Sequence, residues 1–135
     1  MINRLTDALN FQTEALVLRS ERQRLIASNI ANADTPGYVA RDMDFATALR
    51  QATGQIPTAG RLGATAGGHL QPLAGARGEA GLKYATAAQT NLDRNTVDMD
   101  RERASFADNS VKYEATLRFI NGSVRTMLDA IKGQS

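Results

Sequence analysis

The residue types that perform most enzyme chemistry are scarce in this sequence. It has no cysteine, and its single histidine, His69, lies in a glycine-rich stretch. A metal site would therefore have to be built mostly from carboxylates. A surface or packing role is the favoured interpretation of His69, and we expect no cofactor.

Two pairs of closely spaced carboxylates are the remaining candidates for metal binding. Asp42 and Asp44 are two residues apart, which places both side chains on one face of a strand, where they would suit a hard cation. A solvated strand edge is the simpler interpretation, and we favour it. Asp98 and Asp100 are better explained as negative charge at the start of a helix, where the helix dipole favours it. We expect neither a metal site nor a catalytic residue.

Phosphate and nucleic-acid binding have no support either. The glycine-rich run at residues 66–68 lacks the lysine and the following serine or threonine of a phosphate-binding loop. The formal net charge is +2, and residues 1–50 and 96–135 each hold six basic and six acidic residues. No basic stripe can therefore follow a phosphate backbone. The sequence predicts a protein that is not an enzyme and binds neither nucleic acid nor a small-molecule substrate.

Targeting segments are not evident in the pattern of apolar residues. Charged residues interrupt the apolar positions of residues 1–16, so the sequence does not predict a cleavable secretory signal. The longest uncharged apolar runs fall well short of the roughly 20 residues of a membrane-spanning helix.

Residues 1–34 are predicted to form one long helix. Its apolar surface is wider than a two-helix hairpin needs, because two neighbouring stripes recur at helical spacing. The helix should end at or before Asp34, since Pro36 disfavours the helical conformation at Thr35. The first stripe comprises Leu5, Leu9, Leu16, Gln23, Ile26 and Ile30, and the second comprises Phe11, Leu18 and Leu25.

A sharp corner should follow this helix. The sequence Thr35-Pro36-Gly37-Tyr38 fits a type II turn, with the fixed φ of proline at the second position and the tolerance of glycine for positive φ at the third. Residues 39–45 alternate apolar and charged side chains, which predicts a short extended segment, and residues 46–52 suit one or two helical turns.

Asn29 and Asn32 are unusual near a helix end, because asparagine is a poor residue for a helix interior. In one interpretation they bind the last free carbonyl groups of the helix. In the other they form a polar register mark where the helix meets another chain. Their spacing favours the first interpretation.

The middle segment, residues 35–95, changes character. Residues 54–81 hold eight of the eleven glycines and only three charged residues, so this stretch cannot build a core of its own. We expect an irregular loop with at most a short hairpin. Residues 83–89 are ambiguous between structure types.

A second long helix is predicted within residues 96–135. Asn95, Thr96 and Asp98 are all plausible caps at its start. Gly122 in its interior suggests either close approach of another backbone or a bend. A seam of apolar residues spaced by sevens comprises Met99, Phe106, Tyr113, Ile120 and Met127. The complementary positions are Arg103 and Ser110 in the first half and Leu117, Val124 and Ile131 in the second.

The resulting fold class is mainly α. We expect the two terminal helices to pack as an antiparallel coiled-coil-like pair in one elongated subunit, joined by the glycine-rich middle. Such a pair leaves apolar surface to spare, which on a protein of this kind usually means a partner. The sequence therefore predicts an assembly subunit.

Two segments resemble the terminal signatures of one family. SNIANADTPGYVARDMDF at residues 28–45 and NTVDMDRERASFADNSVKYEATLRFING at residues 95–122 are similar to the N- and C-terminal signatures of the flagellar rod and hook proteins, the proximal rod members in particular. The short middle agrees, because hook and distal rod relatives usually carry larger insertions there. Arg94 departs from the pattern, since the family commonly has glycine at this position.

The resemblance implies a structural subunit of the proximal rod of the bacterial flagellar basal body. Its terminal helices would assemble helically with other copies of the chain and with other rod proteins. Further implied partners are the adaptor beneath the rod, the MS-ring and the export gate. It would reach the periplasm-spanning rod through the flagellar type III apparatus without a cleaved signal. A cytoplasmic coiled-coil adaptor or a secretion chaperone is the alternative.

The candidate assembly residues come from both lines of reasoning. Those carried over from the signatures are Asn29, Asn32, Pro36, Gly37, Tyr38, Asn95, Val97, Asp98 and Met99. Those taken from the predicted helix seam are Phe106, Tyr113, Leu117, Ile120, Gly122, Val124 and Met127.

Overall fold

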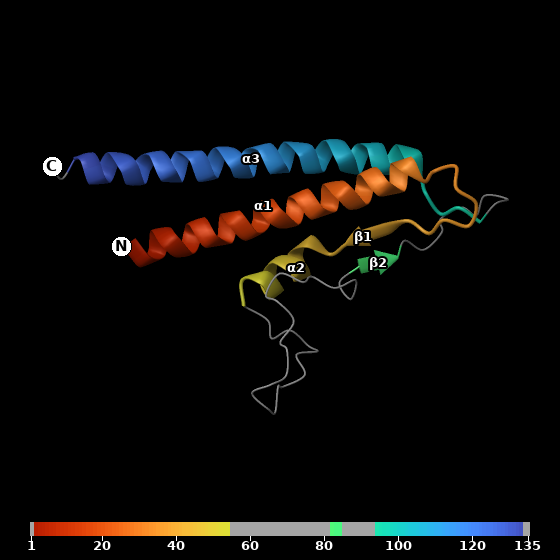
Figure 1. Cartoon of the computed structure of the whole chain (residues 1–135), viewed down its shortest axis with the longest axis horizontal. Helices are drawn as coiled ribbons and strands as arrows, with labels where there is room; N and C mark the ends of the chain where they lie inside the picture. Colours follow the sequence, from red (N-terminus) through yellow and green to blue (C-terminus); the bar gives the residue numbers. More distant parts are fainter. Residues whose placement is uncertain (1, 55–81, 85–93, 134–135) are drawn as a thin grey trace, which may run out of the picture.

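The computed structural model describes residues 2–54, 82–84 and 94–133, and this part of the chain is mainly helical, as predicted (Figure 1). Helices α1 (Ile2–Ala31) and α3 (Met99–Lys132) lie side by side and antiparallel, with both chain termini at the same end. Strand β1 (Arg41–Met43), helix α2 (Phe45–Ala52) and strand β2 (Leu82–Tyr84) complete the described elements. None of the helices described is long and apolar enough to cross a membrane.

The corner after α1 has the predicted geometry. The amide of Tyr38 donates a hydrogen bond to the carbonyl of Thr35 at 3.2 Å, and Gly37 has a φ of +72°. An added Cβ at Gly37 would meet no atom within 4 Å, so the backbone conformation, and not crowding, favours glycine here. The type II turn is therefore confirmed.

Both elements expected after the corner are present. Strand β1 lies in the predicted extended segment, and α2 begins one residue before the predicted short helix. Strand β1 pairs antiparallel with β2, with Arg41 opposite Tyr84 and Met43 opposite Leu82. The predicted loop at residues 55–81, including His69, lies outside the described residues, as do residues 85–93.

Helix α3 starts where the sequence indicated. The carboxylate of Asp98 accepts hydrogen bonds from the backbone amides of Asp100 and Arg101, so Asp98 is the N-cap. Arg94, the residue that departs from the family pattern, has a φ of 58°. This left-handed conformation explains why glycine suits the position.

The core is small and centres on α1, which contacts α3 on one side and α2 and β1 on another (Figure 1). Leu18 and Ile26 are the largest fully buried apolar side chains among the described residues. Four polar residues are buried with them, which is a large share for so small a core. These are Asn29, Asn95, Asn109 and Thr116.

The face that α3 turns towards α1 differs from the predicted seam. The second line of the predicted seam passed through Ser110, Leu117 and Val124. The side chains that are buried or half-buried instead lie one position earlier in the sequence, and they are polar. Val124 is 41% exposed and Ile131 is 69% exposed, although both were predicted to lie in the seam. Phe106, from the first predicted line, is also exposed. The observed complementary line comprises Glu102, Asn109, Thr116 and Ser123.

Candidate assembly site

The two sequence signatures meet at the end of the helix pair where α1 finishes and α3 begins. The side-chain Nδ2 of Asn95 lies 2.9 Å from the carbonyl oxygen of Asn32 and 2.8 Å from those of Ala33 and Thr35. Its Oδ1 accepts a hydrogen bond from the amide of Val97 at 2.8 Å. Asn95 is 0% exposed, so one buried amide both closes the end of α1 and shapes the approach to α3.

Thr96 adds a second connection between the same segments. Its amide donates to the carbonyl of Tyr38 at 3.0 Å, and its Oγ1 accepts from the amide of Ala40 at 2.8 Å. We call these contacts of Asn95 and Thr96 with residues 32–40 the motif clasp. Because it joins segments about 60 residues apart, the clasp sets where α3 starts relative to the end of α1.

Asn29 supports the clasp from within α1. Its Nδ2 donates to the carbonyl of Arg41 at 2.7 Å, and its Oδ1 accepts from the amide of Arg41 at 3.0 Å and from the hydroxyl of Tyr38 at 3.2 Å. The side-chain amide thus takes the place of a neighbouring strand beside β1. Since Asn29 is buried, it is not available to mark a register with another chain.

Asn32 behaves as the favoured interpretation predicted. Its Nδ2 donates to the carbonyl of Ser28 in the last turn of α1 at 2.8 Å, and its Oδ1 accepts from the hydroxyl of Thr35 at 3.2 Å. The two asparagines of the signature therefore have different roles. Asn32 completes the helix end, and Asn29 holds the strand that follows.

Charged side chains connect the clasp to the rest of the chain. The guanidinium of Arg22 binds the carboxylate of Asp42 through two contacts, of 3.1 and 3.3 Å, and the guanidinium of Arg19 stacks 4.3 Å from the ring centroid of Phe45. Burial raises the pKa of Glu102, and the nearby charge of Asp42 acts in the same direction.

Asp42 and Asp44 have structural roles in this arrangement. Asp42 pairs with Arg22, and Asp44 is the N-cap of α2, where its carboxylate accepts from the amide of Thr47 at 3.3 Å. No cluster of three metal-ligating side chains occurs within the described ranges.

Apolar side chains remain exposed on both long helices, away from the clasp. On α3 the largest exposed fractions are 69% for Val111 and Ile131 and 67% for Phe119. The full set on this helix is Phe106, Val111, Phe119, Val124, Leu128 and Ile131, and α1 adds Leu5, Phe11 and Val17. A chain that leaves this much apolar surface uncovered has the character of an assembly subunit.

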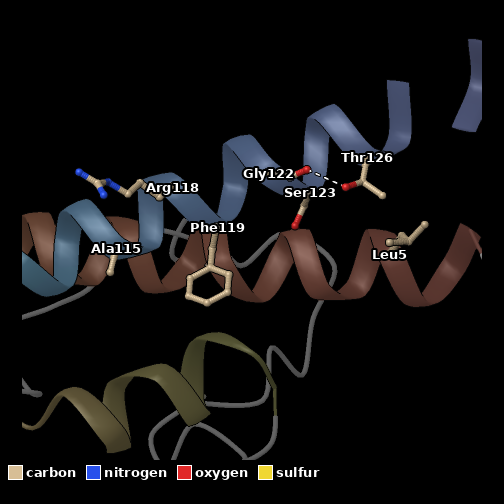
Figure 2. Close-up of a pocket in the computed structure, with 7 residues that line it drawn as sticks. All are labelled: Leu5, Ala115, Arg118, Phe119, Gly122, Ser123 and Thr126. Carbon is tan, nitrogen blue, oxygen red and sulfur yellow. Dashed lines mark hydrogen bonds between the residues drawn. The ribbon is translucent and has the colours of Figure 1, made fainter. Parts of the chain in front are cut away.

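A groove opens between the first turns of α1 and the second half of α3 (Figure 2). Its volume is about 510 Å³, and Leu5 of α1 faces side chains from α3 across it. An added Cβ at Gly122 would meet no atom of the described residues within 4 Å, so no other backbone in the described part of the chain approaches that glycine. The lining residues are Leu5, Ala115, Arg118, Phe119, Gly122, Ser123 and Thr126.

Comparisons with known proteins agree with the signatures. The family model described as "Flagella basal body rod protein" matches residues 9–38. The flagellar basal body rod protein FlgB of Proteus mirabilis strain HI4320 is 47% identical over 135 residues, covering 98% of both chains. The chain belongs to the FlgB family of flagellar basal body rod proteins. The FlgB of Salmonella typhimurium strain LT2 is 46% identical over 136 residues, covering 98% of this chain and 99% of its own.

Membership of the FlgB family makes this chain a structural subunit of the flagellar basal body rod, and not an enzyme. A more distant member, the FlgB of Cereibacter sphaeroides, is still 42% identical over 131 residues, covering 95% of this chain. The adaptor or chaperone alternative receives no support from these comparisons.

Within this FlgB-family chain, the predicted site residues fall into two groups. One group gathers at the clasp end, and the other is spread along α3 and does not converge. The first group comprises Asn29, Asn32, Pro36, Gly37, Tyr38, Asn95, Val97, Asp98 and Met99. The second comprises Phe106, Tyr113, Leu117, Ile120, Gly122, Val124 and Met127.

Sequence reasoning missed the polar contacts between the two long helices. Asn109 and Gln23 bind each other in the first half of α3, where the predicted complementary positions were Arg103 and Ser110 and no role was assigned to Asn109. The sequence carried one signal of this pairing, because Gln23 interrupts a line of apolar residues spaced by sevens, namely Leu9, Leu16 and Ile30.

Proposed function

We propose that this chain is a subunit of the proximal rod that assembles helically through the exposed apolar side chains of its two terminal helices. The observation that carries the proposal is the apolar surface of α3 that α1 does not cover. Burial of a large apolar side chain stabilises an interface by about 1.5 to 3 kcal/mol when it is complete. Several such side chains together are sufficient for assembly with other copies and with other rod proteins.

The proposed position in the rod is supported by the family and by the short middle segment. A subunit of 135 residues, of which α1 holds 30 and α3 holds 34, suits an inner tube without large outer domains. We place it at the rod base, where it would link the MS-ring, the export gate and the adaptor beneath the rod to the distal rod. Its route to that position would be the flagellar type III export apparatus.

Electron microscopy of basal bodies tests the proposal. Basal bodies from cells that lack this chain are expected to show rings without a rod, and supplying the chain should restore the rod. Intact rods in the deletion strain would contradict the assignment.

A surface variant tests the apolar interface itself. Phe119→Asp places a charge on the exposed stripe of α3 and should abolish rod assembly, because the charge would be buried between subunits. Asn121→Asp is the matched control, since it adds the same charge at an exposed position of the same helix outside the exposed apolar set. Normal rods with Phe119→Asp would remove this face from the interface.

A further inference from the structure

A polar contact joins α1 to the first half of α3, where the predicted seam already carried Arg103 and Ser110 at its complementary positions. The Nδ2 of Asn109 donates to the carbonyl of Arg19 at 2.9 Å and to the Oε1 of Gln23 at 2.6 Å. The Nε2 of Gln23 in turn donates to the Oγ of Ser110 at 2.8 Å. We call these three hydrogen bonds the central polar lock. Asn109 is 0% exposed, so the lock is part of the interior.

The central polar lock does not give the most stable packing that this position could have. The Oδ1 of Asn109 is buried without a hydrogen-bond partner among the described residues, and a buried unsatisfied acceptor is a cost to the stability of the folded chain. An apolar side chain at this position would avoid that cost. Buried asparagines in helix pairs commonly specify one alignment at the expense of stability, and the surroundings of Asn109 fit such a role.

The two helices match in only one alignment at the lock. Seven residues from Gln23 in either direction, α1 carries Leu16 and Ile30, whose side chains offer no acceptor to Asn109. Seven residues before Asn109, α3 carries Glu102, whose ionised carboxylate has no donor for the carbonyl of Arg19. A shift of one heptad in either direction therefore leaves buried polar groups unpaired.

A second alternative packing would arise if α3 rotated about its own axis instead of shifting along it. Such a rotation is easier to reach than a shift of a whole heptad. The clasp fixes only the start of α3, and Asn109 lies about 16 Å farther along the helix from Asp98. A rotation of α3 about its axis there would turn Val124 and Ile131 towards α1, beside Leu117, and build the apolar second half of the predicted seam. It would also withdraw the Nδ2 of Asn109 from the carbonyl of Arg19.

We propose that Asn109 and Gln23 determine which face of α3 packs against α1, and so keep the apolar line through Val124 and Ile131 on the outside. The opposing contributions are similar in size. The hydrogen bonds of the lock favour the observed face, and further burial of Val124 and Ile131 would offset their loss if α3 turned. One substitution in the lock is therefore sufficient to change the packed face. The consequence for rod assembly rests on the proposed function, whereas the packed face itself does not.

Cysteine labelling of the purified full-length chain tests the packed face, because the natural sequence contains no cysteine. Ser123→Cys reports a half-buried position that faces α1, and Val124→Cys reports its exposed neighbour. With the lock intact, a maleimide should label Cys at 124 several-fold faster than Cys at 123. With Gln23→Leu, which removes the acceptor for Asn109, the order should reverse.

Two control variants separate the lock from general effects on packing. Thr116→Val changes the same line of α3 but removes only a hydrogen bond within that helix, from Thr116 to the carbonyl of Lys112. Gln23→Glu retains an acceptor for Asn109. Both controls should keep the original labelling order.

A second lock variant keeps the test informative if Gln23→Leu does not fold. Asn109→Ala removes both donors from the other side of the lock and should reverse the order in the same way. An unchanged order in the folded lock variants would overturn the proposal, and so would equal labelling of both positions when the lock is intact. Because no rod is involved in this measurement, its failure is distinguishable from failure of the proposed assembly.

Discussion

The side-chain nitrogen of Asn95 lies 2.8 Å from the carbonyl oxygen of Ala33, although the two residues are 62 positions apart in the sequence. A helix leaves its last carbonyl groups without partners inside the helix, and here the residue that leads into the second helix binds the carbonyls that follow the first. The two family signatures are thus two halves of one intramolecular contact. The contact between the signatures lies within one subunit, where it fixes the start of α3 relative to the end of α1. The outer faces of both helices remain available to neighbouring subunits.

Replacement of Asn95 by alanine should therefore destabilise the helix pair. The change removes the donors to three carbonyl groups at a buried site, and we expect a loss of about 2 to 3 kcal/mol in the free energy of unfolding. Urea unfolding followed by circular dichroism measures it. Asn121→Ala is the control, because Asn121 is exposed in α3 and should lose little. Equal midpoints for the two variants would contradict the role of the clasp.

Arg94→Gly should have the opposite effect on stability. Arg94 has a φ of 58°, a left-handed conformation that costs a residue with a Cβ about 1 to 2 kcal/mol and costs glycine little. Part of that gain is offset because glycine makes the unfolded chain more flexible, so we expect a net stabilisation of about 1 kcal/mol.

Arg94→Ala separates backbone strain from loss of the charge. Alanine keeps the Cβ and hence the strain, so this variant should unfold at the urea midpoint of the natural chain. Stabilisation by both substitutions would assign the effect to the charge of Arg94 instead.

Features specified by neighbouring residues were predictable from the sequence. The type II turn follows from Pro36 and Gly37, and the N-cap of α3 follows from the acidic residues around Asp98. The motif clasp was not predictable, because its hydrogen bonds join segments about 60 residues apart. The packed face of α3 was missed for a different reason. Apolar spacing alone favoured the line through Val124, whereas Asn109 and Gln23 form their hydrogen bond with the neighbouring line turned inward.

Stability should depend on pH through Glu102. Burial raises its pKa in the folded state above the ordinary value. Its contribution to stability is therefore fully present below the pKa of the unfolded chain, and it is lost as the pH rises through the raised folded value. At neutral pH the ionised carboxylate of Glu102 therefore lowers the stability of the folded chain.

Glu102→Gln should consequently raise the melting temperature at pH 7. The gain over the natural chain should shrink as the pH falls through the raised folded pKa, and it should be absent below about 4.5, the ordinary value for this carboxyl group. Thermal unfolding of both chains at each pH makes the comparison, so that the titration of other groups cancels. A gain that stays constant from pH 4 to pH 7 would contradict this role of Glu102.

Gly122→Leu should separate the stability of the subunit from its assembly. Among the described residues no atom lies within 4 Å of an added Cβ, so a side chain can leave the helix at this position without a clash at its Cβ. Leucine also favours a helix interior by nearly 1 kcal/mol over glycine, so the subunit should become slightly more stable. In the proposed rod, however, a neighbouring subunit fills the groove lined by Leu5, Phe119 and Gly122 (Figure 2). The leucine side chain would occupy that space, and cells carrying the variant should not swim.

Gly122→Ala is the graded control for this site. It gives a similar gain in helix stability but adds only one methyl group to the groove, so motility should be reduced less than with leucine. If swimming and basal-body rods are normal with Gly122→Leu, the groove faces solvent in the assembled rod. The interface must then lie on the opposite flank of α3, where Val124, Leu128 and Ile131 are exposed.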